Sequence, residues 1–225
     1  MSNSSAPSQT LILAAFASIY LIWGSTYLAI LFGLESIPPF LLIGLRFFVA
    51  GAILLGWRLL QGERAPRQAA LKHSIAGTLM LFGGTGAVVW VEQYISSGLA
   101  AIIVASMPFW FVLLDYKQWG FNFSNGLILS GILVGFAGVL YLFSAGDLDF
   151  SQGISDQLYS MLVLFAGCIA WAGGSLYLKY QPARMSTGMG AGIQMFAAGV
   201  FSLLVSLQQG ELAGYSWASI SAVSW

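Results

Sequence analysis

Long apolar runs alternate with short polar segments along nearly the whole chain. A helix needs ~20 mostly apolar residues to cross the roughly 30 Å hydrocarbon core of a bilayer. An eighth, shorter apolar run begins near Trp217 and continues to Trp225. The pattern predicts an all-α integral membrane protein with seven full transmembrane helices. They fall at about 11–33, 38–60, 73–92, 97–114, 125–144, 158–178 and 187–207.

Composition supports this class of protein. Hydrophobic residues make up 58% of the chain and charged residues 7%, against roughly 45–50% and about 25% in soluble domains. The formal net charge is zero, so the chain lacks the basic stripe that nucleic-acid binding requires. Residues 1–10 contain no Lys or Arg and therefore lack the basic region of a signal peptide. They are expected to form a cytoplasmic leader before a retained first helix.

The charged residues of the loops predict the orientation. Every Lys or Arg of the loops falls on alternate connections, while the other connections carry only acidic residues. Cytoplasmic loops are enriched in Lys and Arg, so the N-terminus is predicted to be cytoplasmic. The cations are Arg58, Arg64, Arg67, Lys72, Lys117, Lys179 and Arg184, and the acids are Glu35, Glu92, Asp147, Asp149, Asp156 and Glu211.

Two segments of the chain repeat at nearly one offset. GLRFFVAG at 44–51 matches GIQMFAAG at 192–199, an offset of 148 residues, and GSTYL at 24–28 matches GSLYL at 174–178. The repeating unit holds five helices, and an odd number reverses the direction in which the second copy enters the membrane. Inverted repeats are typical of secondary transporters, with a substrate site between them near the bilayer midplane. Ten helices are therefore expected, in a first repeat at 11–144 and an incomplete second repeat at 158–225.

The same segments resemble a known family. IWGSTYLAI, IPPF with GLRFFVAG, and EQYISSGLAAIIVASMPF at 92–109 are similar to EamA-type permeases of the drug/metabolite transporter superfamily. GILVGFAGVLYL at 131–142 and WAGGSLY extend the resemblance over nearly the whole chain. It implies a permease, often an exporter, of a small organic molecule in the bacterial inner membrane, with no cofactor.

The chain holds few residues suited to catalysis or metal binding. Cys168 is its one cysteine and His73 its one histidine, which excludes an internal disulfide and a Cys-based metal cluster. No nucleophile–base pair or carboxylate cluster is evident. The sequence therefore predicts neither an enzyme nor a metal site.

Arg46 is the clearest candidate for a functional residue. It lies ~12 Å below the outer surface at 1.5 Å per residue, where a charge costs roughly 2.5–3.5 kcal/mol on insertion scales. Its repeat counterpart is Gln194. We expect both to face one central cavity. The alternative is that Arg46 extends outward to Glu92 or bonds backbone carbonyls as a packing element.

Other candidates are polar and aromatic groups at corresponding places in the two repeats or beside the third helix. Each also has a structural interpretation, as an interfacial aromatic residue, a packing residue or, for Glu92, a hydrated carboxylate. The substrate-cavity candidates besides Arg46 and Gln194 are Trp23, Ser25, Tyr27, Trp90, Glu92, Trp171, Ser175 and Tyr177.

Glycine and proline mark candidate kinks or hinges. Pro108 should kink the fourth helix by removing a backbone hydrogen bond. Gly83, Gly84 and Gly86 support either local unwinding or close helix packing.

The favoured function is alternating-access transport of a small organic metabolite or drug. The expected partners are this substrate and the lipid bilayer, with a homodimer as a further alternative. A non-transporting membrane fragment or assembly subunit stays open as a second hypothesis. A retinal protein is disfavoured, since the helix at 187–207 has no lysine and the predicted N-terminus is inside.

Overall fold

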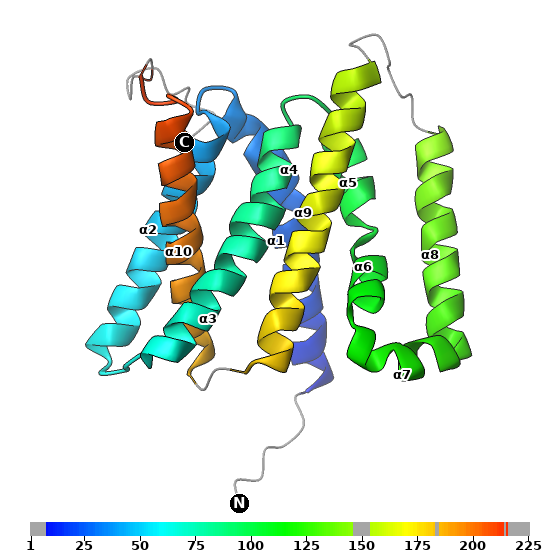
Figure 1. The fold of residues 1–225 in the computed structure, drawn as a ribbon, viewed down its shortest axis with the longest axis horizontal. Helices are drawn as coiled ribbons and strands as arrows, with labels where there is room; N and C mark the ends of the chain where they lie inside the picture. The colour runs from blue at the N-terminus through cyan, green and yellow to red at the C-terminus, as the bar shows by residue number, and fades with distance from the viewer. Residues whose placement is uncertain (1–7, 146–153, 183–184, 214, 216–225) are drawn as a thin grey trace, which may run out of the picture.

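A computed structural model describes residues 8–145, 154–182, 185–213 and Tyr215. The described residues form helices and connecting turns (Figure 1). In chain order the helices are α1 (Gln9–Leu34), α2 (Pro39–Leu60), α3 (Arg67–Gly77), the π-helix η1 (Thr78–Thr85), α4 (Gly86–Val91), α5 (Ser97–Val104), α6 (Met107–Leu114), the 3₁₀-helix η2 (Tyr116–Gln118), α7 (Trp119–Ser124), α8 (Gly126–Ala145), α9 (Ile154–Tyr180) and α10 (Thr187–Gln208).

Among the described residues, six helical spans are long and apolar enough to cross a membrane, and the bent α7–α8 segment gives a seventh. The all-helical, membrane-spanning fold is therefore as predicted. The third span begins at Arg67, earlier than the predicted residue 73, and α1 begins at Gln9, inside the predicted leader. The eighth apolar run from Trp217 lies outside the described residues.

Local capping explains where several helices begin and end. The hydroxyls of Ser8, Ser96 and Ser186 cap α1, α5 and α10 by accepting hydrogen bonds from backbone N–H groups. After α2 and α10 the chain turns at Gly62 (φ 80°) and Gly210 (φ 72°), in the left-handed region that glycine adopts without strain.

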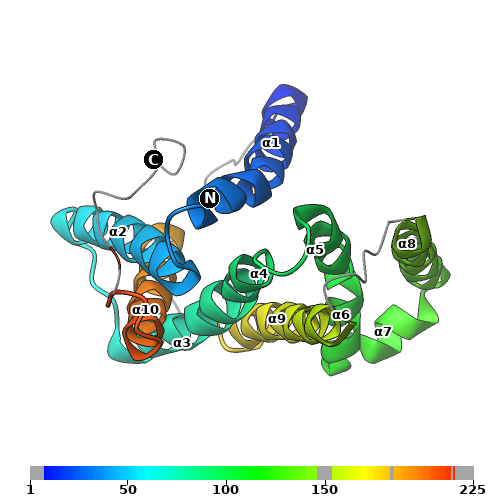
Figure 2. The ribbon, with the colours of Figure 1, turned by 90° about the horizontal axis from the view of Figure 1, so that it is seen from above.

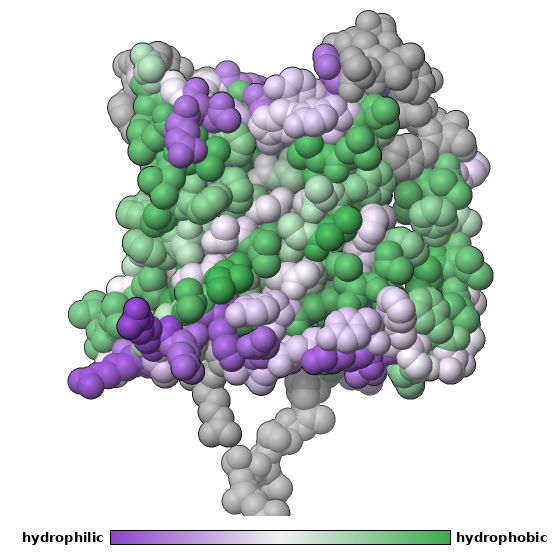
Figure 3. Space-filling view, in the orientation of Figure 1, coloured by the Kyte–Doolittle hydropathy of each residue, from purple (hydrophilic) through white to green (hydrophobic). Residues whose placement is uncertain are grey.

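The described loop cations lie at one end of the bundle. The α2–α3 connection, η2 with α7, and the end of α9 share the lower end in Figure 1. Figure 3 shows an apolar belt across this face of the molecule, with hydrophilic residues along its lower rim. This arrangement agrees with the alternation of charge predicted from the loops. Arg184, Asp147 and Asp149 lie outside the described residues.

Helices α2 and α10 lie side by side and run in opposite directions (Figures 1 and 2). Glycines permit the close crossing: a Cβ at Gly51 would lie 2.7 Å from Phe196 Cα, and a Cβ at Gly199 would lie 2.6 Å from Phe48 Cα. Gly51 and Gly199 are 148 residues apart, as are Phe48 and Phe196. The same glycine–phenylalanine contact thus occurs twice, as expected where α2 and α10 are related by an approximate two-fold axis.

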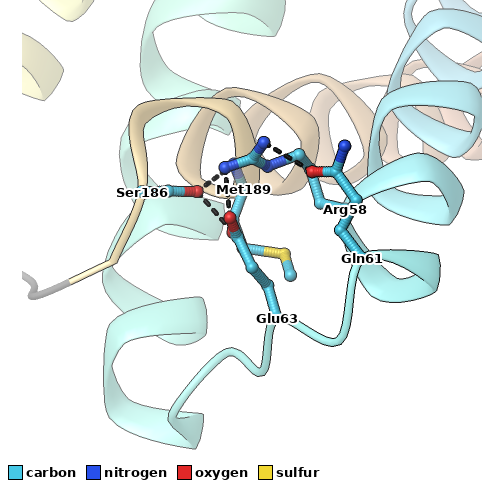
Figure 4. A network of polar contacts seen from close by, with 5 residues as sticks. All are labelled: Arg58, Gln61, Glu63, Ser186 and Met189. Carbon is cyan, nitrogen blue, oxygen red and sulfur yellow. Dashed lines mark hydrogen bonds and ion pairs between the residues drawn. The ribbon is translucent and has the colours of Figure 1, made fainter.

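Carboxylates tie α2 and α10 together at both ends. At the lower end, Glu63 pairs with Arg58 and accepts a hydrogen bond from the hydroxyl of Ser186, the residue that caps α10 (Figure 4). At the upper end, Glu211 accepts hydrogen bonds from the backbone N–H groups of Phe40 (3.2 Å) and Leu41 (2.8 Å). Each glutamate therefore stabilises the N-terminus of the other segment's helix.

The predicted kink sites have different structural roles. The break between α5 and α6 comes just before Pro108. Pro108 therefore lies in the first turn of α6, a position that proline tolerates. Gly83 and Gly84 lie in the π-helix η1. Gly86 begins α4, where an added Cβ would meet only ordinary van der Waals contacts. The third membrane span is therefore an α-helix that is interrupted near its centre by the π-helix η1.

Candidate functional site

A cavity of about 790 Å³ lies between α1 and the helices α2, η1, α4, α5, α6 and α9. Its walls are mainly aliphatic and aromatic side chains, with few polar groups. The lining residues are Ser18, Ile19, Ile22, Trp23, Thr26, Tyr27, Ile30, Arg46, Phe47, Leu81, Gly84, Thr85, Val88, Val104, Met107, Phe111, Leu164, Gly167, Cys168 and Trp171.

Helix α1 contributes one continuous face to the cavity. Lining residues from Ile19 to Ile30 recur at spacings of three and four, the spacing that places side chains on one side of an α-helix. On the opposite wall, α9 packs closely against η1 because Gly84 has no side chain: a Cβ there would lie 2.6 Å from Trp171 Cε3. The π-helix therefore makes room for the Trp171 ring beside the cavity.

Two predicted residues meet at this cavity. The rings of Trp23 and Trp171 lie 6.2 Å apart between centroids, tilted by 36°. Trp23 directly precedes GSTYL at 24–28, and Trp171 stands shortly before GSLYL at 174–178, so the matched regions of α1 and α9 contact each other here. Tyr27, also predicted, lines the same cavity.

Arg46 carries the only positive charge among the described lining residues. It is exposed, and it also lines a smaller adjoining cavity of about 170 Å³. Its guanidinium carbon lies 5.8 Å from the ring centre of Phe47, within the range of a cation–π contact. Within the described part of the chain, Arg46 has no ion pair or side-chain hydrogen bond, and no Asp or Glu lines the cavity.

Gln194 does not share this cavity, contrary to the expectation from the repeat. Its amide nitrogen lies 2.9 Å from His73 Nδ1, and its backbone packs on Gly77, where a Cβ would lie 2.8 Å from the Gln194 carbonyl carbon. Arg46 and Gln194 occupy matching places in α2 and α10 by the 148-residue offset. Their side chains differ because Gln194 has a polar partner on α3.

The other candidates lie outside the cavity lining. Ser25 donates a hydrogen bond to the carbonyl of Ile22 within α1. Trp90 contacts the rings of Tyr94 and Tyr159 at 4.8 and 5.8 Å. Ser175 and Tyr177 lie on α9 near its lower end, both partly buried.

Glu92 is buried just past the end of α4, with 6% of its surface exposed. Burial raises the pKa of Glu92 to about 7, and the Ser97 hydroxyl opposes this shift. The expectation of a hydrated carboxylate at this position is therefore wrong. Burial therefore favours the protonated form of this carboxyl more than in a solvated glutamate.

A second acidic group joins the lower ends of α6 and α9. Asp115 accepts hydrogen bonds from Lys179 Nζ at 2.6 Å and from the Tyr180 hydroxyl. Desolvation acts to raise the pKa of Asp115, but these hydrogen bonds and the charge of Lys179 lower it overall. Asp115 thus favours its ionised form and fastens the two helices beside the cavity.

Phe47, Met107 and Phe111 also line the cavity and were not among the candidates predicted from the sequence. The signal for Phe47 was its position directly after Arg46 at the repeat match. The repeat of the turn QGE was not predicted either: this turn occurs at 61–63 and again at 209–211, at the same 148-residue offset. Among the described residues, no group of three or more His, Cys, Asp or Glu side chains is placed to hold a metal.

Comparison with known proteins places this geometry in context. Residues 9–144 match the EamA-like transporter family. The chain is 38% identical over 200 residues to an uncharacterized inner membrane transporter, YedA, of Escherichia coli K12, covering 88% of this chain and 62% of the relative. It is 24% identical over 172 residues to an uncharacterized transporter, YoaV, of Bacillus subtilis, covering 76% and 58%.

The chain thus spans about three-fifths of the length of these relatives. No solved structure matches it.

Proposed function

Because the chain belongs to the EamA-like transporter family, we propose that the protein moves a small organic molecule across the bacterial inner membrane. The carrying observation is the cavity walled by Trp23 and Trp171, where the matched regions of α1 and α9 meet. The names of the relatives, an inner membrane transporter among them, support the same role. The protein acts as a permease, without covalent chemistry on its solute.

The size and lining of the cavity support a solute of metabolite size. Small-molecule sites are usually 300–1,000 Å³, mainly apolar, with a few polar groups that orient the ligand. The cavity of about 790 Å³ fits this range. Trp23, Tyr27 and Trp171 give it broad aromatic surfaces suited to an organic body.

We further propose that the N-terminus is cytoplasmic and that transport runs outward. The cation-bearing connections at one end of the bundle support the orientation. Alternating access then opens the cavity to each side of the membrane in turn, by movement of the first repeat (11–144) against the second (158–225).

The test compares the solutes released by bacteria that overproduce the protein with those released by bacteria lacking it. A solute enriched in the medium identifies the substrate. Trp171→Ala should reduce its release at least tenfold per molecule of membrane protein, whereas Trp57→Ala, on an exposed position outside the lining, should leave release unchanged. Equal solute profiles with and without the protein, in both directions of transport, would instead favour a non-transporting membrane scaffold.

A further inference from the structure

The cavity is asymmetric in charge. Its one described cation is Arg46, and neither Asp nor Glu lies among the residues lining it. The described ion pairs use other groups: Glu63 pairs with Arg58, and Asp115 pairs with Lys179. Glu211 is committed to the backbone of α2. The positive charge of Arg46 is therefore not neutralised within the described structure.

Arg46 lies about two turns into α2, inside a membrane-spanning helix. Charged groups at such depth are costly and usually face a pathway or a partner. The repeat does not supply a second charge, since the equivalent Gln194 is neutral and bonded to His73. The cavity is thus a positive site of one charge with aromatic and aliphatic walls.

These features favour a solute with a negative charge at one end and an apolar body at the other. A carboxylate matches the planar donor fork of arginine and accepts two parallel hydrogen bonds. The remaining walls, including Trp23, Phe47 and Trp171, favour an apolar or aromatic body over a strongly hydrated one. Tyr27 offers a further hydroxyl on the α1 wall.

We propose that Arg46 is the anion-binding residue of this cavity and that the solute is an amphipathic organic anion, a carboxylate on an apolar or aromatic body. This inference rests on the proposed transport function and assigns its substrate class. Lipid phosphate is a competing source of negative charge. Arg46 lies in the second turn of α2, ~10 Å from its N-terminus at 1.5 Å per residue, deeper than headgroups normally lie.

The experiment uses two probes that share one ring system and differ by one charge: 1-naphthylacetate and the neutral 1-naphthylacetamide. Their dissociation constants are measured by calorimetry on the protein in phosphatidylcholine nanodiscs. The wild type should bind the acid ten- to a hundredfold more tightly than the amide, the range expected for hydrogen bonds to a charged group. Arg46→Gln should abolish this preference, chiefly by weakening acid binding. Arg64→Gln, an exposed cation outside the cavity, should preserve both affinities.

Arg46→Lys provides a second variant that keeps the charge. It should weaken acid binding by roughly three- to tenfold because lysine lacks the bidentate fork, and amide binding by less. The inference is overturned if acid and amide bind the wild type equally, if the preference survives Arg46→Gln, or if Arg46→Lys leaves acid binding unchanged. It is also overturned if phosphatidylglycerol displaces the acid through Arg46, since the site would then hold a lipid headgroup.

The result separates this inference from the transport function. Equal binding of both probes that is lost in Trp171→Ala removes the preference for anions and leaves the transport proposal standing. Absence of any transported solute in the release experiment contradicts the transport proposal directly.

Discussion

The rings of Phe48 and Phe196 lie 5.0 Å apart between centroids, tilted by 32°, at the crossing of α2 and α10. The two residues occupy equivalent positions in the two segments. Gly51 and Gly199, also 148 residues apart, make the reciprocal close approaches to Phe196 and Phe48. Helices α2 and α10 therefore cross with an approximate local two-fold symmetry.

The glycine crossing should determine the stability of the α2–α10 pair. Gly51→Ala or Gly199→Ala should each lower the free energy of unfolding by about 1–3 kcal/mol, because the added Cβ overlaps backbone atoms of the partner helix. Thermal unfolding in detergent measures the loss. Gly56→Ala is the matched control, since a Cβ there meets no atom within 4 Å. An unchanged melting temperature for both crossing variants would contradict the close packing.

The two glutamate ties should contribute separately. Glu63→Ala and Glu211→Ala should each destabilise the protein by about 1 kcal/mol, the typical cost of losing a helix cap. The double variant should show the sum, because sites more than about 10 Å apart are usually additive and these lie at opposite ends of the pair. Glu35→Ala, exposed at the end of α1, serves as the control. Strong non-additivity would show that the ends are coupled.

Glu92 should make stability fall as the pH rises. Its pKa is about 7 in the folded protein against 4.5 ordinarily, so between these values the unfolded chain releases a proton that the folded protein keeps. Its stabilising contribution is full below pH 4.5 and is lost progressively up to about pH 7. The fall in melting temperature from pH 5 to pH 7.5 should be smaller in Glu92→Gln. An identical pH slope in the variant would exclude Glu92 as its source.

Asp115 should act in the opposite direction. Its pKa is lowered in the folded protein, so its contribution is present above its ordinary pKa and is lost as the pH falls through the lower folded value. Asp115→Asn should therefore destabilise the protein at neutral pH and weaken its further loss of stability in acid. Melting curves at pH 7 and pH 3 test this, with Asp156→Asn, at an exposed position, as the control.

The proposed orientation can be tested by labelling. In a Cys168→Ala background, an impermeant thiol reagent added to intact spheroplasts should modify Glu35→Cys and spare Arg64→Cys. These positions lie in connections at opposite ends of the bundle. Labelling of Arg64→Cys alone would place the N-terminus outside.

The helices were predictable because each spans the membrane as an apolar run, a property of local composition. The break at 105–106 lies just before Pro108, where a kink was expected, and the π-helix at 78–85 contains two of the glycines for which local unwinding was one alternative. The helix type and the bounds of these features were not predictable, since both lie inside runs that remain apolar throughout. They depend on partners distant in the chain, such as Trp171 against Gly84. Tertiary packing decides such details.

The candidate site was predictable in part. A deep charge such as Arg46 must face a cavity or a partner, and the structure places it at a cavity. Its counterpart Gln194 was assigned by symmetry of depth, but the direction of its side chain depends on His73. The repeated QGE turn was visible in the sequence, yet polar turns lie outside the apolar runs that define the spans.

Phe48 and Phe196 occupy matching places in the repeat and also contact each other, which has an evolutionary consequence. A substitution in either copy alters the surroundings of its own counterpart, so neither ring can change size independently after duplication. Covariation between positions 148 apart in an alignment of relatives would then report direct contact as well as shared ancestry. A tandem repeat related by translation would lack this signature, because its equivalent residues lie apart.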